Sequence, residues 1–216
     1  MAEYELICCI VNMGDASKVL KAARQHGVKE GTVTIGKGTL HSRVMAFLQI
    51  HDVRKEIVTM VVPAHLAAGA IRGISEKMAF EKPHHGIAFT HPVEQLLGSR
   101  HTTQHNTKTN EVESSMYNAI YVIVERGKAE DVVEAANQAG ARGATIINAR
   151  GVGSEEPQRL FAIEIEPEKE KVIIITPQDK KDQIIAAVKQ HLNIDEPGNG
   201  IIFVLDVNEA YGLHQG

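Results

Sequence analysis

The stretch ICCIVNMGDASKVLKAARQHG, residues 7–27, returns in altered form as IYVIVERGKAEDVVEAANQAG, residues 120–140. The alignment runs without a gap through Gly38 and Gly151, and it resumes after a one-residue change of offset within residues 39–54. Both copies also keep two prolines, at 63 and 83 in the first and at 177 and 197 in the second. A collinear match of this length indicates a tandem duplication, in which the length change marks a surface loop.

Each copy predicts the same six elements in the order βαββαβ. Helices are expected where apolar residues recur at helical spacing, and strands where runs are apolar and β-rich. The expected strands are residues 4–12, 31–37, 55–62 and 86–90 in the first copy, and 117–125, 144–150, 170–176 and 200–205 in the second, with first helices over 15–26 and 128–139 and second helices opening at Pro63 and Pro177.

This order predicts an α+β protein of tandem ferredoxin-like (βαββαβ) domains, each an antiparallel sheet with both helices on one face. The other face of each sheet must be buried elsewhere, so we expect the chain to oligomerise. The predicted domains are residues 1–98 and 116–216. Residues 99–115 between them are polar with a single apolar side chain, which predicts a linker.

Composition narrows the class of function. There is no Trp, aromatic residues make up 4%, and the net charge is −4 with a pI near 6.3, which argues against direct binding of nucleic acid. The adjacent Cys8 and Cys9 point to opposite faces of a strand, so neither a disulfide nor a metal clip is expected from them. The N-terminus lacks a basic signal-peptide region and no apolar run approaches the roughly 20 residues of a membrane span, which predicts a cytoplasmic protein that is not membrane-embedded.

Three glycine-rich stretches are candidates for binding an anion. Residues 31–39, GTVTIGKGT, resemble a phosphate-binding P-loop, but the intervening residues are a predicted strand and a second strand follows, so we reject that interpretation. Gly151-Val-Gly153 ends one strand and Gly198-Asn-Gly200 begins another. Both allow backbone amides to approach an anion, and both equally fit tight turns at strand ends.

At this point the sequence resembles a known family. Gly140-Ala-Arg-Gly143-Ala-Thr145 with Arg150-Gly151-Val-Gly153 is similar to the second strand of the P-II nitrogen-regulatory family. Residues 171–177, KVIIITP, resemble its third strand, and residues 198–207, GNGIIFVLDV, its fourth. The resemblance covers nearly all of residues 117–212 and, through the internal repeat, residues 5–98 more weakly.

The resemblance implies a trimer of small ferredoxin-like subunits that holds ATP, ADP or AMP as an effector in clefts between subunits. By position, Thr145 would contact the adenine and Ile175 would line the adenine pocket. Gly151 and Gly153 would contact the phosphates. Gly198 and Gly200 would form the second backbone wall of the site. In the first copy Thr32, Gly38 and Gly86 keep this pattern, while His84 and His85 depart from it, so that site is expected to be degenerate. Arg150 and Lys37 are the basic residues of the expected set.

At several positions where the family has a basic residue, this chain has an uncharged one. The Lys after the last glycine is Ile201 here and Ile87 in the first copy, and the Arg after the Gly-x-Gly is Ser154. Arg142, Arg150 or Arg159 of a neighbouring subunit would have to compensate the phosphate charge.

The resemblance therefore predicts a non-enzymatic signal-transduction protein, with the regulation of nitrogen utilisation as its expected role and with no covalent cofactor and no metal. Its loops 38–54 and 151–169 would contact a transporter, an enzyme or a transcription regulator. One alternative is a divalent-metal trimer resembling the CutA family, with His41, His84, His85 and His91 at an interface, or His101 and His105. Another is a ligand-free interaction scaffold. No nucleophile elbow or acid pair beside a His suggests catalysis.

Overall fold

The computed structural model describes residues 3–40, 53–93, 96, 116–150, 158–160, 163–165 and 168–213. The chain forms two compact units that exchange short segments. Unit 1 holds residues 1–34, 55–117 and 206–216, and unit 2 holds residues 35–54 and 118–205. The strand β2 (Thr32–Leu40) therefore begins in unit 1 and ends in unit 2.

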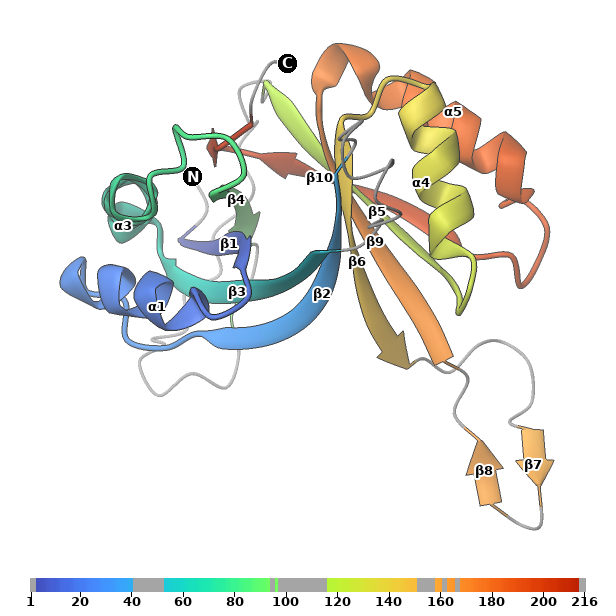
Figure 1. Cartoon of the computed structure of the whole chain (residues 1–216), viewed down its shortest axis with the longest axis horizontal. Coiled ribbons are helices and arrows are strands. Elements are labelled where there is room, and N and C mark those ends of the chain that lie inside the picture. The colour runs from blue at the N-terminus through green and yellow to red at the C-terminus, as the bar shows by residue number, and fades with distance from the viewer. Residues whose placement is uncertain are drawn as a thin grey trace. The chain divides into compact units, whose positions relative to one another are not determined.

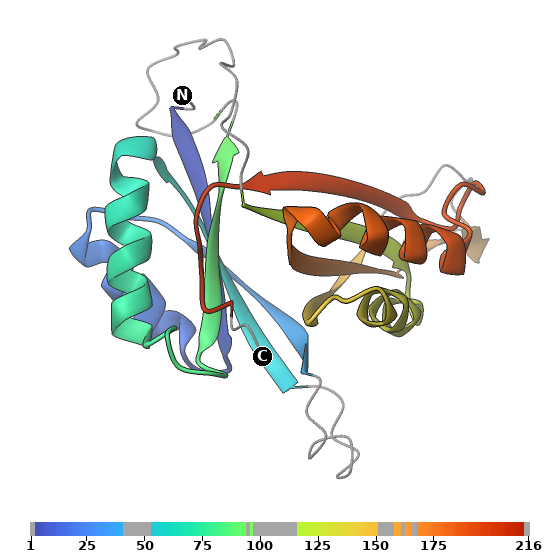
Figure 2. The same ribbon diagram turned by 90° about the horizontal axis from the view of Figure 1, so that it is seen from above.

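Unit 1 is built on the first copy. Its strands are β1 (Tyr4–Asn12), the start of β2, β3 (Val53–Pro63), β4 (Gly86–Val93) and the short C-terminal β11 (Ala210–Tyr211), and its helices are α1 (Ala16–Gln25) and α3 (Ala64–Met78). The strand order is β2-β3-β1-β4-β11, and β1 is antiparallel to both β3 and β4. Figure 2 shows α1 and α3 side by side on one face of this sheet.

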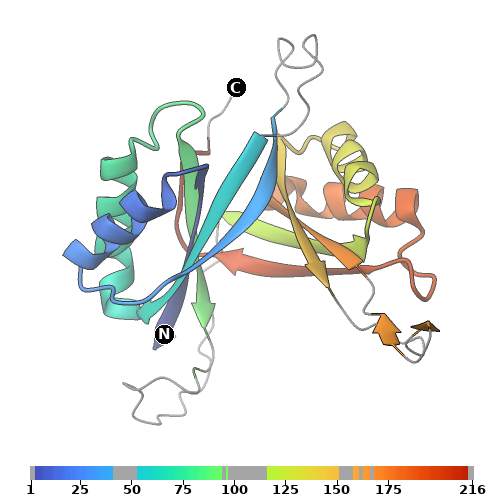
Figure 3. The same cartoon turned by 60° about the horizontal axis from the view of Figure 1, so that its bottom comes forward.

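Unit 2 repeats the arrangement with the second copy. Its strands are β5 (Tyr117–Glu125), β6 (Gly143–Arg150), β9 (Glu168–Pro177) and β10 (Ile201–Val207), and its helices are α4 (Ala129–Gln138) and α5 (Gln178–Leu192). The order β10-β5-β9-β6 matches β4-β1-β3-β2 of unit 1, strand for strand. In Figures 1 and 3, α4 and α5 cover one face of the unit 2 sheet. The predicted α+β fold of tandem ferredoxin-like domains is confirmed.

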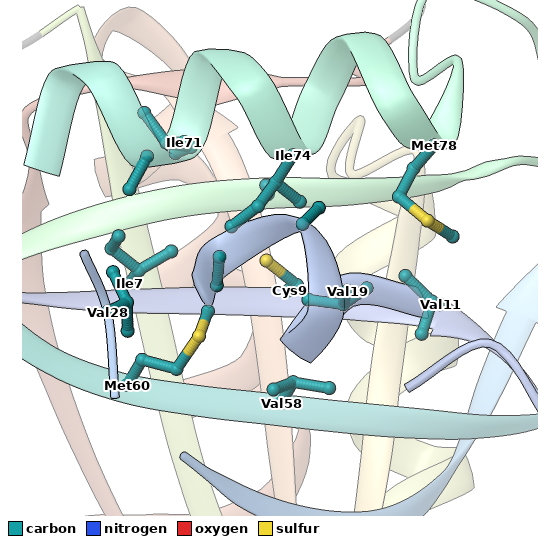
Figure 4. Packing of buried hydrophobic residues seen from close by; sticks show 14 of the residues in the cluster. Ile7, Cys9, Val11, Val19, Val28, Val58, Met60, Ile71, Ile74 and Met78 are labelled. Carbon is teal, nitrogen blue, oxygen red and sulfur yellow. The ribbon is translucent and has the colours of Figure 1, made fainter. Parts of the chain in front are cut away.

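Each unit has its own hydrophobic core between the sheet and its two helices. In unit 1, Ile7, Cys9 and Val11 of β1 and Val58 and Met60 of β3 pack against the helices (Figure 4). In unit 2, the corresponding positions are Ile120, Val122, Val124, Val172 and Ile174. Cys8 is also buried but lies outside the unit 1 core cluster, which agrees with the prediction that the two adjacent cysteines point to opposite faces of the strand.

The start of the first helix in each copy is held by a carboxylate from the third strand. Glu56 of β3 accepts hydrogen bonds from the backbone N–H groups of Gly14 and Ala16, at 3.0 and 2.7 Å. Glu170 of β9 accepts the equivalent bonds from Gly127 and Ala129, at 3.0 and 2.9 Å. Neither helix has a cap from the side chain of its own N-cap residue. The Glu pair kept by the repeat thus supplies the acceptor that helix N-termini need.

The predicted boundaries hold to within a few residues, but one pair of strands was not predicted. β7 (Gln158–Leu160) and β8 (Ile163–Ile165) form an antiparallel hairpin inside the predicted loop 151–169. Most of the loop 38–54, namely residues 41–52, and the linker 99–115 lie outside the described residues. The domain limits 1–98 and 116–216 stay a prediction. None of the helices in the described part of the chain is long and apolar enough to cross a membrane.

Candidate functional site

The predicted adenine-binding residues share one face of the unit 2 sheet. Thr145 of β6 lies opposite Ile173 of β9 in the antiparallel register, so their side chains point to the same face, as does Ile175 two residues further on. The neighbouring Ile146 and Ile174 belong to the core under the helices. Thr145 and Ile175 therefore lie on the face opposite the helices, where Thr145 is buried and Ile175 is half-buried.

Two predicted residues of the first copy lie beside this group. The end of β2 pairs with β6 inside unit 2, with Lys37 opposite Ile146 and Gly38 opposite Thr145. Thr39 fixes this register, because its hydroxyl donates to the Ala144 carbonyl at 3.0 Å and accepts the Ala144 N–H at 3.1 Å. Gly38 is buried and Lys37 is exposed. Gly38 of the first copy and Thr145 of the second copy are thus paired in the β2–β6 ladder.

The structure separates the remaining second-copy candidates from this ladder. Arg150 is exposed at the end of β6. Gly198 and Gly200 precede β10, which is separated from β6 by β5 and β9. Gly151 and Gly153 lie outside the described residues. Thr32 is exposed at the start of β2, in unit 1.

The fold itself requires glycine at positions 86 and 200. Their φ angles are 130° and 135°, and a Cβ at either position would come within 2.7 or 2.6 Å of the carbonyl oxygen of Ile10 or Ile123. Any side chain there would clash with backbone in a conformation that favours glycine. The repeat of these glycines is therefore explained without a ligand. Gly198 differs, because at its φ of 93° no atom lies within 4 Å of the place that a Cβ would occupy.

Two histidines of the metal alternative, His85 and His91, have a backbone carbonyl beside the ring in the described part of the chain. The Nδ1 of His91, a buried residue, lies 2.7 Å from the Asp206 carbonyl oxygen, and Nδ1 of His85 lies 3.1 Å from that of Met78. Burial lowers the pKa of His91, and the hydrogen bond to Asp206 opposes this shift only in part. Among the described residues no group of three His, Cys, Asp or Glu side chains is placed to hold a metal ion. His41, His101 and His105 lie outside those residues.

An aromatic pair on unit 2 was not predicted from the sequence. The rings of Tyr121 on β5 and Phe203 on β10 stack with centroids 5.0 Å apart and an interplanar angle of 3°. The Lys171 ammonium lies 6.0 Å from the centre of the Tyr121 ring. The repeat keeps Phe203 as Phe89, but Tyr121 stands at the position of Cys8, so the pair itself leaves no signal in the repeat.

A surface depression of about 460 Å³ lies at the C-terminal end of α5, away from the candidate residues. It is lined by Ala186, Lys189, Gln190, Asn193, Asp195 and Glu196. None of these residues belongs to the predicted ligand set, so this depression adds nothing to the candidate site.

Comparisons with known proteins point to one family. Residues 117–216 match the family described as nitrogen regulatory protein P-II. The curated relative "Nitrogen fixation nifHD region GlnB-like protein 1" of Methanothermococcus thermolithotrophicus is 26% identical over 98 residues, which are 45% of this chain and 93% of the relative.

Two solved structures are also similar to about half of the chain. A B. subtilis GlnK–ATP complex aligns with a TM-score of 0.36 and 20% identity, covering 47% of this chain and 97% of that one. Arabidopsis thaliana PII bound to citrate aligns with a TM-score of 0.34 and 26% identity, covering 44% and 77%.

The family match and the candidate site fall on the same part of the sequence. Thr145, Arg150, Ile175, Gly198 and Gly200 all lie within the matched residues 117–216. The first copy is joined to this match by the internal repeat and by the same strand order. Residues 117–216 are therefore P-II-like, and the first copy repeats their βαββαβ order.

Proposed function

We propose that this chain is a cytoplasmic signal-transduction protein of nitrogen regulation, not an enzyme, which binds an adenine nucleotide and controls a partner protein. The nucleotide would bind in clefts between subunits of a homo-oligomer, with a trimer as the expected form. The partner, a transporter, an enzyme or a transcription regulator, would be contacted through the loops 38–54 and 151–169.

The observation that carries the nucleotide proposal is the pairing of Gly38 with Thr145 inside unit 2. Gly38 puts no side chain beside the buried Thr145 hydroxyl, and the apolar Ile173 and Ile175 continue the same face along β9. Apolar side chains with a few placed polar groups are typical of a site for a base.

The phosphates would need positive charge, which the chain offers in a different pattern from the family. Ile201 is apolar and 56% exposed where the family has its Lys. Lys37 and Arg150 are the exposed cations among the candidates, Lys37 in the β2–β6 ladder opposite Ile146 and Arg150 at the end of β6, where it pairs with Glu168 of β9. We propose that Arg150 contacts the phosphates, because a guanidinium can bind them in a bidentate way.

Calorimetric and thermal-shift titration with ATP, ADP and AMP, each with and without Mg²⁺, tests this proposal. A nucleotide present at 100 times its dissociation constant should stabilise the protein by about 2.7 kcal/mol. Arg150→Ala should weaken binding about tenfold or more, since charge-assisted hydrogen bonds contribute about 1.5–3 kcal/mol. Thr145→Val should weaken binding by removing the hydroxyl at nearly constant volume.

The matched control is Lys21→Ala, which removes an exposed cation from α1 and should leave nucleotide affinity unchanged. Gly200 is unsuitable as a test position, because its substitution disturbs the fold whether or not a ligand binds. Absence of a response to every nucleotide would contradict the proposal. Equal losses in Arg150→Ala and Lys21→Ala would remove the assigned role of Arg150.

A further inference from the structure

The first helices of the two copies have the same buried side and opposite charges on the other side. α1 and α4 align residue for residue, as ASKVLKAARQ and AEDVVEAANQ. Four buried positions are identical in the two helices: Ala16 and Ala129, Val19 and Val132, Ala22 and Ala135, and Ala23 and Ala136. The remaining positions of α1 hold three basic and no acidic residues, whereas those of α4 hold three acidic and no basic residues. The duplicated helix thus kept the side that packs on the core and inverted the charge of the side that does not.

The inversion falls on equivalent positions of the repeat. Lys18 corresponds to Asp131, and Lys21 corresponds to Glu134. Lys18, Lys21 and Glu134 are exposed, and Asp131 is half-buried. A solvated helix face gains from both signs at spacings of three and four residues, where opposite charges attract and like charges repel. A single sign on each helix forgoes this local gain and leaves each face complementary to the other.

The helix dipole does not account for these charges. It favours acidic residues in the first turn of a helix and basic residues in the last turn. α1 has no acidic residue in its first turn and carries Lys18 there, and α4 has no basic residue in its last turn. Lys21 and Glu134 lie in the middle of their helices, where the dipole has little effect. The two mid-helix charges therefore have no explanation in the helix ends.

The chain compensates these charges only in part. Each helix has one ion pair at its start, Lys18 with Asp15 at 2.7 Å and Lys128 with Asp131 at 3.4 Å. The mid-helix Lys21 and Glu134 have no ion pair with any residue that the structure describes. Gln138 donates a hydrogen bond to Glu134 at 3.2 Å but brings no charge. The middle of each face is thus free to pair with an opposite charge from outside.

We propose that α1 of one chain docks on α4 of a second copy of this chain, basic face against acidic face. Because the mid-helix charges are exposed within one chain, a second copy supplies the complementary charge. Lys21 then faces Glu134 whether the helices run parallel or antiparallel, and Lys18 and Arg24 on either side face Asp131 and Asn137. The contact is heterologous, so identical chains are joined head to tail. This inference goes beyond the proposed function, and neither helix carries a residue of the candidate site.

Carbodiimide cross-linking of mixed chains tests this contact. An isotope-labelled and an unlabelled form of the full chain are mixed in urea in equal amounts and refolded together, so that every assembly holds both forms. A water-soluble carbodiimide then joins lysine amines to carboxylates that touch them, and mass spectrometry of the linked peptides identifies the chains of origin. Lys82, an exposed lysine between α3 and β4, gives the background frequency of links to α4.

The expected links join Lys18 or Lys21 to Asp131 or Glu134, at least tenfold more often than Lys82. They should join a labelled to an unlabelled chain as often as two chains of one label. Salt at about 1 M, where the Debye length is about 3 Å, should reduce them about tenfold. Links found only between peptides of the same label would overturn the proposal in favour of a contact within one chain. Links no more frequent than those of Lys82 would overturn the contact altogether.

Charge reversal separates a specific pair from a general attraction. Glu134→Lys puts like charges in contact, so the remaining links of Lys18 and Lys21 to Asp131 should fall about tenfold. Adding Lys21→Glu to the same chain rebuilds the pair with its charges exchanged, so links between positions 21 and 134 should return to their original frequency. Lys82→Glu is the matched control and should leave the links unchanged. Unchanged Asp131 links in Glu134→Lys, or no link between positions 21 and 134 in the double variant, would overturn the pairing.

Discussion

Strands β4 and β10 come from the same ancestral strand and have become different surfaces. At the start of both, a glycine at high positive φ is followed by Ile, with Gly86 the first residue of β4 and Gly200 just before β10, and both carry Phe at the same position, 89 and 203. In unit 1 the strand is covered along its edge by residues 208–211, and Phe89 is buried. In unit 2 the strand ends the described sheet, and Phe203 is stacked on Tyr121 but partly exposed. A duplicated sequence thus keeps the positions that build the fold, while the pairing of the strand edge and the burial of the equivalent Phe differ between the copies.

The largest expected effect comes from truncating the two phenylalanines. Phe89→Ala should lower the free energy of unfolding by about 3–5 kcal/mol, the usual cost for a fully buried Phe. Phe203→Ala should cost about 1–2 kcal/mol, because its ring is 39% exposed and loses mainly the stack on Tyr121. Urea denaturation of both variants measures the difference, and equal losses at low protein concentration would contradict the contrast between the two edges.

A smaller and equal effect is expected at the carboxylates that hold the first helices. Glu56→Ala and Glu170→Ala should each cost about 1–2 kcal/mol, because each leaves two N–H groups at a helix start without their acceptor. Denaturation of Glu56→Gln and Glu170→Gln provides the control, since the amide oxygen keeps an acceptor and should restore most of the loss. A large loss in one copy alone would show that the glutamate of the other copy no longer stabilises its helix start.

The smallest effect is a pH dependence confined to unit 1, where His91 stands at the position of Leu205. Burial lowers the pKa of His91 in the folded protein, so the unfolded chain binds the proton more readily. The contribution of the neutral His91 ring to the free energy of unfolding is therefore complete above the ordinary pKa of about 6.5, and it is lost progressively as the pH falls below that value. His91→Leu should flatten this part of the pH–stability profile, and an unchanged slope below about pH 6.5 would contradict the assignment.

The fold was predictable because it rests on local signals that occur twice. Apolar spacing, the prolines at 63 and 177 and the glycines after the first helices set the element order, and Gly27 and Gly140 do adopt positive φ. The docking of β11 on β4 was not predictable, because a strand of only two residues depends on pairing with a strand more than a hundred residues away. The β7–β8 hairpin was also missed, since its strands are only three residues long.

The candidate site could be predicted only in part, since spacing does not separate a ligand glycine from a structural one. Thr145, Ile175 and Gly38 were named from the sequence, and their common face follows from the register of β2, β6 and β9. Gly86 and Gly200 were named on the same grounds, but the nearby carbonyl oxygens of Ile10 and Ile123 already require them. The stack of Tyr121 on Phe203 depends on long-range pairing that no short motif encodes.

Hydrogen–deuterium exchange of the full chain with and without ADP tests most directly that the second copy holds the nucleotide. Protection is expected in peptides covering residues 143–150 and 171–176, which carry Thr145, Arg150 and Ile175, together with residues 36–40 of the paired β2. Peptides covering residues 84–91 of the first copy should be unchanged. Protection confined to residues 84–91, or no change at saturating ADP, would contradict the account.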